Sequence, residues 1–341
     1  MRRVLIIKTS SMGDVIHTLP ALTDAQRLLP GILFDWVVEE GFAEIPSWHP
    51  AVDRVIPVAI RRWRKNIVRS LRGTEVRHFK AELARHHYDL VIDAQGLMKS
   101  AWITRFINAP CVGYDRRSVR ESFASMAYKL KVPVSRDMHA VERTRELFAA
   151  ALNYPKPVLV GEYQLDKKSF RAFDPAERSL VFIHSTTQSD KHWPEVYWRK
   201  LCELTTAEGY TVNLPWGTEA EKARSLRLAA GLNNIEVLPK LNLKSIASVL
   251  NQATGVVSVD TGLGHLSAAL DKPTVSLYGP TSPKLIGAYG QNQVHLSAKN
   301  ITSLRAIAPG IVPEVFQYLT PDIVFAALQS LLNRNETLDQ S

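Results

Sequence analysis

Short apolar runs alternate with amphipathic helical stretches along the whole chain, and this alternation constrains the fold more than any other feature. Such an order is typical of α/β proteins whose strands form parallel sheets. The runs that we interpret as strands are Val4–Ile7, Phe34–Val38, Val52–Val58, Leu90–Ile92 and Cys111–Tyr114, then Leu180–Ile183, Thr211–Leu214, Ile235–Leu238, Val256–Val259 and Thr274–Tyr278. Predicted helices between strands of the second series include 195–208, 220–230 and 243–250. We therefore predict two successive α/β series.

The length of 341 residues exceeds what one hydrophobic core usually covers, so two domains are expected. Pro155, Pro157 and Gly161 follow the first series and indicate a linker over residues 153–163. This divides the chain into an N-terminal domain at 1–152 and a C-terminal domain at 164–318. The remaining segment, 319–341, begins with an amphipathic helix predicted over 321–332.

One turn between a predicted strand and a predicted helix suits a phosphate. The run Val256–Val259 ends at Asp260, and Thr261-Gly262-Leu263-Gly264-His265 leads into a helical stretch. The first N–H groups of a helix have no partner inside it, so they attract anions. The alternative is an ordinary turn whose glycines serve only tight backbone geometry.

A second polar loop, residues 184–194, follows the first strand of the same predicted domain. It carries several hydroxyl groups and Lys191, whose ammonium group suits the charge that accumulates on a departing diphosphate. A capped loop with a surface lysine is the competing interpretation. Because both loops follow parallel strands of one domain, we predict that they bind the same ligand.

The N-terminal domain has its own polar loop after its first strand, Lys8-Thr9-Ser10-Ser11-Met12-Gly13-Asp14. Ligands of open α/β sheets bind at the carboxyl ends of the strands, so the loops predict a cleft between two domains. The Asp14 carboxylate either caps the following helix or takes a hydroxyl proton as a general base. A carboxylate base opposite a bound diphosphate is the arrangement of a single-displacement glycosyl transfer.

The net charge of +9 is concentrated in one segment. Residues 54–85 hold ten basic and two acidic residues, with Trp63 among them. A solvated face is one explanation. The other is an anionic partner that relieves the repulsion among these cations, namely nucleic acid, an acidic membrane surface or a multiply charged substrate.

Several classes of protein are excluded by missing motifs. The chain has no Walker loop, complete Gly-x-Gly-x-x-Gly, Gly-x-Ser-x-Gly, His-Glu-x-x-His, paired Cys-x-x-Cys or Asp-x-Asp motif. No window approaches the roughly 18 consecutive apolar residues of a membrane span. Two cysteines indicate a reducing compartment without disulfides, and Lys8 ends the first apolar run too early for a secretion signal. We expect a cytoplasmic protein.

Five motifs resemble the ADP-heptose:lipopolysaccharide heptosyltransferase family of GT-B glycosyltransferases, and the first heptosyltransferases within it. The likeness covers nearly the whole chain. Its motifs are Lys8-Thr9-Ser10-Ser11-Met12-Gly13-Asp14-Val15-Ile16-His17, Trp36-Val37-Val38-Glu39-Glu40-Gly41-Phe42, Asp93-Ala94-Gln95-Gly96, Asp190-Lys191-His192-Trp193-Pro194 and Asp260-Thr261-Gly262 to His265. The second of these, together with the basic run Ile60-Arg61-Arg62-Trp63-Arg64-Lys65, points to the first heptosyltransferases.

The resemblance implies a GT-B fold of two Rossmann-like domains, with the last helix packing back on the first domain. It also implies inverting transfer of L-glycero-D-manno-heptose from ADP-heptose to the Kdo disaccharide of lipid A, without a metal. Asp14 would be the general base, and Lys191 would stabilise the departing diphosphate. The implied donor-binding residues are Thr186, Thr187, Lys191, Glu221, Asp260, Thr261, Gly262 and His265.

The acceptor implied by the resemblance is polyanionic and lies in an acidic membrane leaflet, which agrees with the basic segment. Our acceptor-binding candidates are Ser11, Gly13, Arg61, Arg62, Arg64, Lys65, Lys99 and Arg120. We expect peripheral attachment to the cytoplasmic face of the inner membrane. Residues 66–80 and 115–137 fit the family pattern poorly.

Two rival interpretations stay open. The first is another enzyme with the same donor loops, either the second heptosyltransferase of the pathway or a sugar-nucleotide epimerase. The second is a non-enzymatic nucleic-acid-binding protein that uses residues 54–85, although no nucleic-acid motif accompanies that charge and we expect no nucleic-acid partner.

Overall fold

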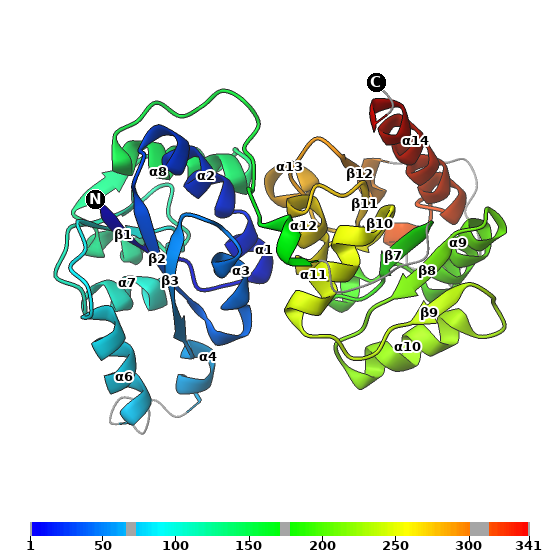
Figure 1. Cartoon of the computed structure of the whole chain (residues 1–341), viewed down its shortest axis with the longest axis horizontal. Helices are drawn as coiled ribbons and strands as arrows, with labels where there is room; N and C mark the ends of the chain where they lie inside the picture. The colour runs from blue at the N-terminus through cyan, green and yellow to red at the C-terminus, as the bar shows by residue number, and fades with distance from the viewer. Residues whose placement is uncertain (1, 66–72, 171–177, 301–313, 340–341) are drawn as a thin grey trace. The chain divides into compact units, whose positions relative to one another are not determined.

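The computed structural model describes residues 2–65, 73–170, 178–300 and 314–339. The chain divides into two compact units between Asp166 and Lys167. Each unit is an α/β structure built on one six-stranded sheet (Figure 1). Arg69 and Arg72 of the basic segment lie outside the described residues.

The sheet of the first unit is parallel throughout, with strand order β3-β2-β1-β4-β5-β6. Its strands are β1 (Arg3–Ile7), β2 (Leu33–Glu39), β3 (Val52–Val58), β4 (Leu90–Asp93), β5 (Cys111–Tyr114) and β6 (Leu130–Val132). The α-helices are α1 (Met12–Ile16), α2 (Leu19–Leu28), α3 (Glu44–Ser47), α4 (Ile60–Trp63), α6 (Thr74–Leu83), α7 (Met98–Thr104) and α8 (Ala140–Leu152). Two short 3-10 helices are η1 (Glu40–Phe42) and η2 (Ser122–Ala127).

The sheet of the second unit is also parallel, with strand order β12-β11-β10-β7-β8-β9. Its strands are β7 (Ser179–Ile183), β8 (Thr211–Leu214), β9 (Ile235–Val237), β10 (Gly255–Val259), β11 (Thr274–Tyr278) and β12 (Gln293–Ser297). The α-helices are α9 (Glu195–Ala207), α10 (Glu219–Ala229), α11 (Leu243–Gln252), α12 (Gly262–Ala269), α13 (Pro283–Ile286) and α14 (Pro321–Asp339). The 3-10 helices are η3 (Lys167–Phe170), η4 (Ser189–Lys191), η5 (Ala298–Asn300) and η6 (Glu314–Phe316).

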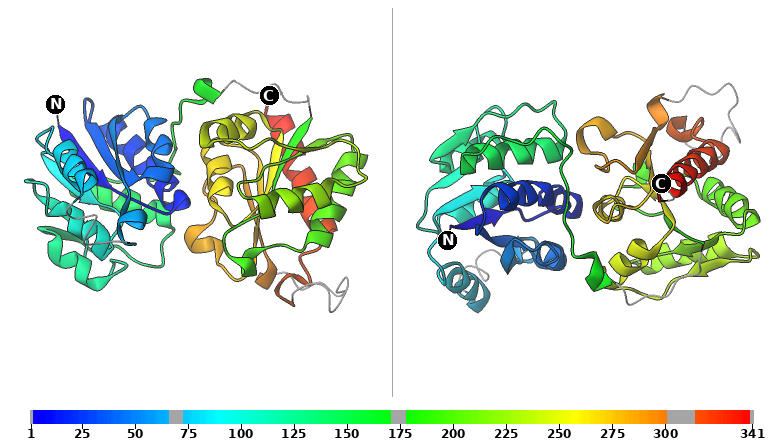
Figure 2. Two further views of the ribbon diagram at one scale, coloured as in Figure 1. Left: turned by 90° about the horizontal axis from the view of Figure 1, so that it is seen from below. Right: turned by 45° about the horizontal axis from the view of Figure 1, so that its top comes forward.

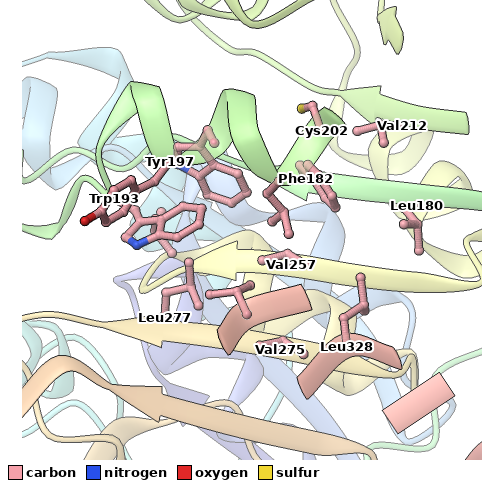
Figure 3. Packing of buried hydrophobic residues seen from close by; sticks show 14 of the residues in the cluster. Leu180, Phe182, Trp193, Tyr197, Cys202, Val212, Val257, Val275, Leu277 and Leu328 are labelled. Atoms are coloured by element: carbon pink, nitrogen blue, oxygen red, sulfur yellow. The ribbon is translucent and has the colours of Figure 1, made fainter. Parts of the chain in front are cut away.

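The core of the second unit forms where apolar strand residues meet the buried faces of α9 and α14. Trp193 and Trp198 stack edge to face with ring centroids 5.1 Å apart, and Phe182 packs beside Trp198 at 5.6 Å. Figure 3 shows Leu328 of α14 among the buried strand residues of this core. Aromatic side chains of this size supply much of the apolar area that stabilises such a core.

The final helix, α14, belongs to the second unit. Val324, Leu328 and Leu331 of α14 are buried, and the helix packs on α9, β10, β11 and β12 of the second unit (Figure 2). Its apolar face therefore completes the core of the second unit. The burial of Leu332 against Gly255 of β10 shows how close this contact is.

The segment predicted as a linker, 153–163, belongs to the first unit. Asn153 ends α8 in the left-handed conformation, and Gly161 lies against Arg145, where a Cβ atom would come within 3.0 Å of the guanidinium Nε. Glu162 forms an ion pair with Arg27 at 2.5 Å. The segment with these prolines and this glycine therefore packs on α2 and α8. The boundary between the units comes after it in the chain.

The ten predicted strands and the parallel pairing are confirmed, whereas the two edge strands β6 and β12 were not predicted. β6 has three residues, of which Leu130 and Lys131 are exposed, and β12 alternates too weakly for a periodic signal. Each unit also contains one buried free cysteine, Cys111 in β5 and Cys202 in α9.

Candidate functional site

The polar loop after β1 is held by its neighbours in the first unit. The indole Nε1 of Trp36 donates to the Lys8 carbonyl at 3.0 Å. The Gln95 amide oxygen accepts hydrogen bonds from the backbone N–H groups of Thr9, at 2.9 Å, and Ser10, at 3.0 Å. Because both strand β2 and the loop after β4 fix its backbone, this loop presents the start of α1 in a defined position.

Asp14 lies at the third position of α1, where it completes a capping box with Ser11. Its Oδ2 accepts from the Ser11 backbone N–H at 2.8 Å and from the Ser11 hydroxyl at 3.0 Å. Its Oδ1 lies 3.8 Å from the Lys8 ammonium nitrogen, and 32% of the Asp14 side chain is exposed. The cap therefore occupies one carboxylate oxygen, and the other faces a cation.

These surroundings set the ionisation of Asp14. Burial opposes its negative charge, but Lys8 and the two hydrogen bonds from Ser11 outweigh burial and lower the pKa of the carboxyl below its ordinary value. Asp14 is consequently ionised at neutral pH, which a proton acceptor requires. A lowered pKa also makes it a weaker base, so any proton transfer to it must coincide with bond formation.

Lys8 was not among our predicted site residues. Its ammonium group is buried and donates to the Ala94 carbonyl at 3.0 Å. Burial lowers the pKa of Lys8, against the opposing effect of Asp14 and Asp93. The available signal was a lysine directly after a buried strand, where burying a cation is costly unless a carboxylate is near.

The predicted acceptor-binding residues fall into two groups. Ser11, Gly13 and Lys99 come together, because the Lys99 ammonium donates to the Ser10 hydroxyl at 2.9 Å. The second group lies on α4, on the residues just after it and on the loop before η2, and it comprises Arg61, Arg62, Arg64, Lys65 and Arg120. Arg120 acts electrostatically on Lys8 and Asp14 of the loop after β1, and Arg61 and Arg64 act in the same way on Lys99.

Part of the basic segment is paired with acidic groups of the first unit. Arg62 bridges Glu40 at 3.1 Å and Glu75 at 2.6 Å, and Arg54 pairs with Glu82 at 3.1 Å. A pocket of about 530 Å³ beside edge strand β3 is lined partly by these acidic groups. Arg62 therefore contributes less net attraction for an anion than its sequence context predicts.

Glu39 at the end of β2 was also missed. Its side chain is 4% exposed, and Oε1 accepts from the Arg61 backbone N–H at 2.9 Å. Among the described residues, its buried Oε2 has no hydrogen-bond partner. A buried carboxylate oxygen without a donor is costly, so Glu39 is suited to accept a hydrogen bond from a ligand.

In the second unit, the predicted donor-binding loops converge on Asp260 at the end of β10. The Lys191 ammonium donates to Asp260 Oδ2 at 2.7 Å, and the Thr186 hydroxyl donates to the Asp260 carbonyl at 3.2 Å. Thr281, which was not predicted, donates to the same Oδ2 at 2.8 Å. Since an ammonium group has three donors, Lys191 keeps donor capacity for a phosphate oxygen.

Helix α12 begins beside this cluster with Thr261 as its N-cap. Gly262 is its first residue, and His265 is buried in its first turn. A Cβ atom on Gly264 would lie 2.7 Å from the Ser258 hydroxyl oxygen, so glycine lets the helix approach β10 closely. The first turn of α12 therefore lies at the end of β10 that also carries Asp260. Backbone N–H groups in the first turn of a helix can donate to an anion.

Glu221 and Thr187 have different surroundings. Glu221 Oε2 accepts from the backbone N–H groups of Gly217 at 2.7 Å and Thr218 at 3.0 Å, in a capping box at the start of α10. Thr187 is exposed on the same loop as Lys191. His192, which was not predicted, contacts the Thr186 carbonyl at 2.8 Å and so ties that loop together.

Two further properties of the described residues bear on the site. Within residues 2–65, 73–170, 178–300 and 314–339, no group of three or more His, Cys, Asp or Glu side chains is placed to hold a metal ion. None of the helices in those ranges combines the length and apolar character needed to cross a membrane.

Comparisons with known proteins agree with this architecture. The family model of glycosyltransferase family 9 (heptosyltransferase) matches residues 76–306. Lipopolysaccharide heptosyltransferase 1 of Pseudomonas aeruginosa is 61% identical over 297 residues, which cover 87% of this chain and 84% of the relative. The Escherichia coli K12 protein of the same name is 53% identical over 311 residues, covering 90% and 97% of the two chains.

Solved structures give the same result. The E. coli heptosyltransferase WaaC with ADP superposes with a TM-score of 0.87 and 51% identity, covering 96% of this chain and 99% of that one. The same enzyme with ADP-2-deoxy-2-fluoro heptose gives 0.84 and 50%, covering 98% and 99%. The fold defines this protein as a glycosyltransferase with GT-B architecture, which confirms the predicted enzyme class and fold class. The chain belongs to glycosyltransferase family 9, the heptosyltransferases.

Proposed function

We propose that this enzyme transfers L-glycero-D-manno-heptose from ADP-heptose to the Kdo disaccharide of lipid A, with inversion at the transferred carbon. The observation that carries the proposal is the pair of strand-end loops, one presenting the Asp14 carboxylate and the other the Lys191 ammonium. Relatives named lipopolysaccharide heptosyltransferase 1 support the choice of donor and pathway.

In this proposal the second unit binds ADP-heptose through its diphosphate. Lys191 donates to a phosphate oxygen while its contact with Asp260, at 2.7 Å, fixes the position of its side chain. The N–H groups at the start of α12 supply the remaining donors. As the bond between the sugar carbon and the phosphate oxygen breaks, the electron pair stays on ADP, and these groups stabilise the added charge.

The first unit supplies the nucleophile. A hydroxyl oxygen of the Kdo acceptor attacks the sugar carbon from the face opposite the diphosphate, and its proton passes to Asp14 Oδ1 as the new glycosidic bond forms. Glu39 Oε2, buried and lacking a donor among the described residues, would accept a hydrogen bond from another hydroxyl of the acceptor. The resulting products are the extended lipid and ADP.

We further propose that no metal ion takes part, because protein cations and helix dipoles face the diphosphate. A chelator such as EDTA should leave the rate unchanged. Strong inhibition that added magnesium reverses would contradict this part of the scheme.

The decisive experiment incubates the purified protein with ADP-heptose and Kdo-modified lipid A and measures product mass. We expect a gain of one heptose and release of one ADP for each acceptor. An epimerase would change the donor without any acceptor, and a second heptosyltransferase would react only with an acceptor that already carries one heptose. Either result would overturn the proposal. By this scheme the enzyme acts on the cytoplasmic face of the inner membrane, where its acceptor lies.

A further inference from the structure

The 3-10 helix η2 in the first unit exposes large apolar side chains and buries small ones. Phe123 is 70% exposed and Met126 is 77% exposed, while Ala124 and Ser125 are buried. A 3-10 helix has three residues per turn, so residues three apart lie on the same face. Phe123 and Met126 therefore project together, the reverse of the usual pattern for a short surface helix.

Helix α7, which packs on η2, and strand β6, which follows η2 in the chain, also expose apolar side chains. Leu130 of edge strand β6 is 49% exposed, and Met98 at the start of α7 is 52% exposed. Helix α7 packs on η2, and the Met98 backbone N–H donates to Glu121 Oε2 at 2.6 Å just before η2 begins. We call Met98, Phe123, Met126 and Leu130 the η2 patch. Exposed large apolar groups on elements close to one another are typical of interaction sites.

Basic residues surround the η2 patch. Five exposed cations lie in the same stretch, against two acidic residues, giving residues 115–131 a charge of +3. These cations are Arg116, Arg117, Arg120, Lys129 and Lys131. The two carboxylates are already engaged, since Asp115 accepts from the Ser118 backbone N–H at 2.7 Å and Glu121 accepts from Met98. The rim of the patch therefore presents net positive charge.

We propose that the η2 patch inserts into the headgroup region of an anionic lipid bilayer, with Lys129 and Lys131 contacting lipid phosphates. This inference rests on the proposed function, because a lipid-linked acceptor requires the enzyme to reach a membrane surface. Apolar side chains inside a cationic rim match a bilayer whose headgroups are acidic and whose interior is apolar. A second copy of the chain fits less well, because a two-fold contact would bring two positive rims together.

Neither half of the patch suffices for firm attachment. Single apolar anchors bind membranes only marginally, and stable attachment takes an apolar signal together with a basic one. Each basic residue near an anionic surface contributes roughly a fivefold change in partitioning. We therefore expect the apolar residues and the lysines to contribute separately, each pair changing the partition coefficient on the order of tenfold or more.

The test is sedimentation of the full-length protein with vesicles of phosphatidylcholine containing phosphatidylglycerol, and with vesicles of phosphatidylcholine alone. The variants are Phe123→Ser/Met126→Ser and Lys129→Gln/Lys131→Gln. The matched control is Val196→Ser/Leu226→Ser in the second unit, whose replaced side chains are 50% and 53% exposed. We expect both patch variants to lose at least about tenfold in binding to the anionic vesicles, and the control to bind as the wild type does.

Activity separates this inference from the proposed function. With acceptor dispersed in detergent, the patch variants should turn over normally, whereas with acceptor in anionic vesicles they should slow. Wild-type binding by the apolar variant, or wild-type protein that binds neither kind of vesicle, would overturn the membrane assignment while leaving heptose transfer intact. A wild-type dimer that the apolar variant converts to monomer in sedimentation velocity would also overturn it, in favour of self-association. Failure of transfer by the wild-type protein in detergent would instead refute the proposed function.

Discussion

Each unit places a lysine beside an aspartate at a strand end, but the two pairs expose opposite partners. In the first unit, 32% of the Asp14 side chain is exposed and 10% of the Lys8 side chain. In the second unit, 5% of the Asp260 side chain is exposed and 15% of the Lys191 side chain. The separation also differs, at 3.8 Å for the first pair and 2.7 Å for the second.

This inversion gives the two loops different chemical capacities. A carboxylate that reaches solvent beside a buried ammonium can accept a proton, while its charge stays favourable. An ammonium that reaches solvent beside a buried carboxylate can donate to an anion from a fixed position. The same two residue types thus produce a base in one unit and an anion-binding group in the other, depending on which partner the fold buries.

The largest effect is expected from Asp14→Asn. The asparagine keeps an oxygen for the Ser11 N–H group, so the cap on α1 survives, but it cannot take a proton. Turnover should fall roughly 10²-fold to 10⁴-fold, while ADP-heptose affinity, measured by calorimetry, stays unchanged. Asp115→Asn, which alters another turn carboxylate of the first unit, is the control. Near-normal turnover of Asp14→Asn would remove Asp14 from the role of base.

Lys191→Ala tests the exposed lysine of the pair in the second unit. The substitution leaves the buried Asp260 carboxylate without its cation. We expect kcat/KM to fall roughly 10²-fold to 10³-fold, together with weaker ADP binding. The exposed Lys240→Ala in the same unit should have little effect. Unchanged ADP affinity in Lys191→Ala would show that the pair of Lys191 and Asp260 only stabilises the fold. It would exclude Lys191 as an anion-binding group.

The buried lysine of the first pair is tested by pH. Lys8 holds the pKa of Asp14 below its ordinary value, so the base stays ionised as pH falls towards that value. In Lys8→Met this attraction is lost, the pKa of Asp14 rises, and the acid limb of kcat/KM should move to higher pH. Lys99→Met, which removes a lysine bonded to Ser10 instead, should move the limb less. Identical acid limbs in wild type and Lys8→Met would exclude the proposed coupling.

The smallest effect is expected on stability, from a change in the packing of α12 against β10. Gly264→Ala places a Cβ atom 2.7 Å from the Ser258 hydroxyl oxygen, which should lower the free energy of unfolding by about 1–3 kcal/mol in urea titrations. Adding Ser258→Ala removes that oxygen and should restore part of the loss. Gly41→Ala, where no heavy atom lies within 4 Å of the added Cβ, is the control. Full stability of Gly264→Ala would show that α12 can shift away from β10.

The sequence predicted the central strands well because their residues are apolar on both faces, as in a parallel sheet covered by helices. It did not predict β6 and β12, because edge strands are short and partly polar. Helix α14 shows a different limit of a sequence pattern. Its apolar stripe predicts that one face is buried but does not say which sheet buries it, and Leu328 and Leu331 complete the second core.

The structure brings predicted site residues together where each stands in a motif, and their roles stay predictions. Lys191 and Asp260 are 69 positions apart, yet each stands in a recognisable loop, and they meet at 2.7 Å. Thr281 carries no such signal, and the motif that contains Glu39 does not show that its Oε2 is buried without a donor among the described residues. The ion pair of Arg62 was not predicted for the same reason, since Glu40 lies 22 positions away in the sequence.

The two cysteines give each unit its own internal reporter. Cys111 lies in the first sheet and Cys202 in a helix of the second unit, and burial raises the pKa of both thiols, that of Cys202 to about 12. Neither thiol is ionised or accessible while its unit is folded, so alkylation requires that unit to open. Removing one cysteine at a time would let the opening rate of each half be followed separately in the intact enzyme, with no label introduced.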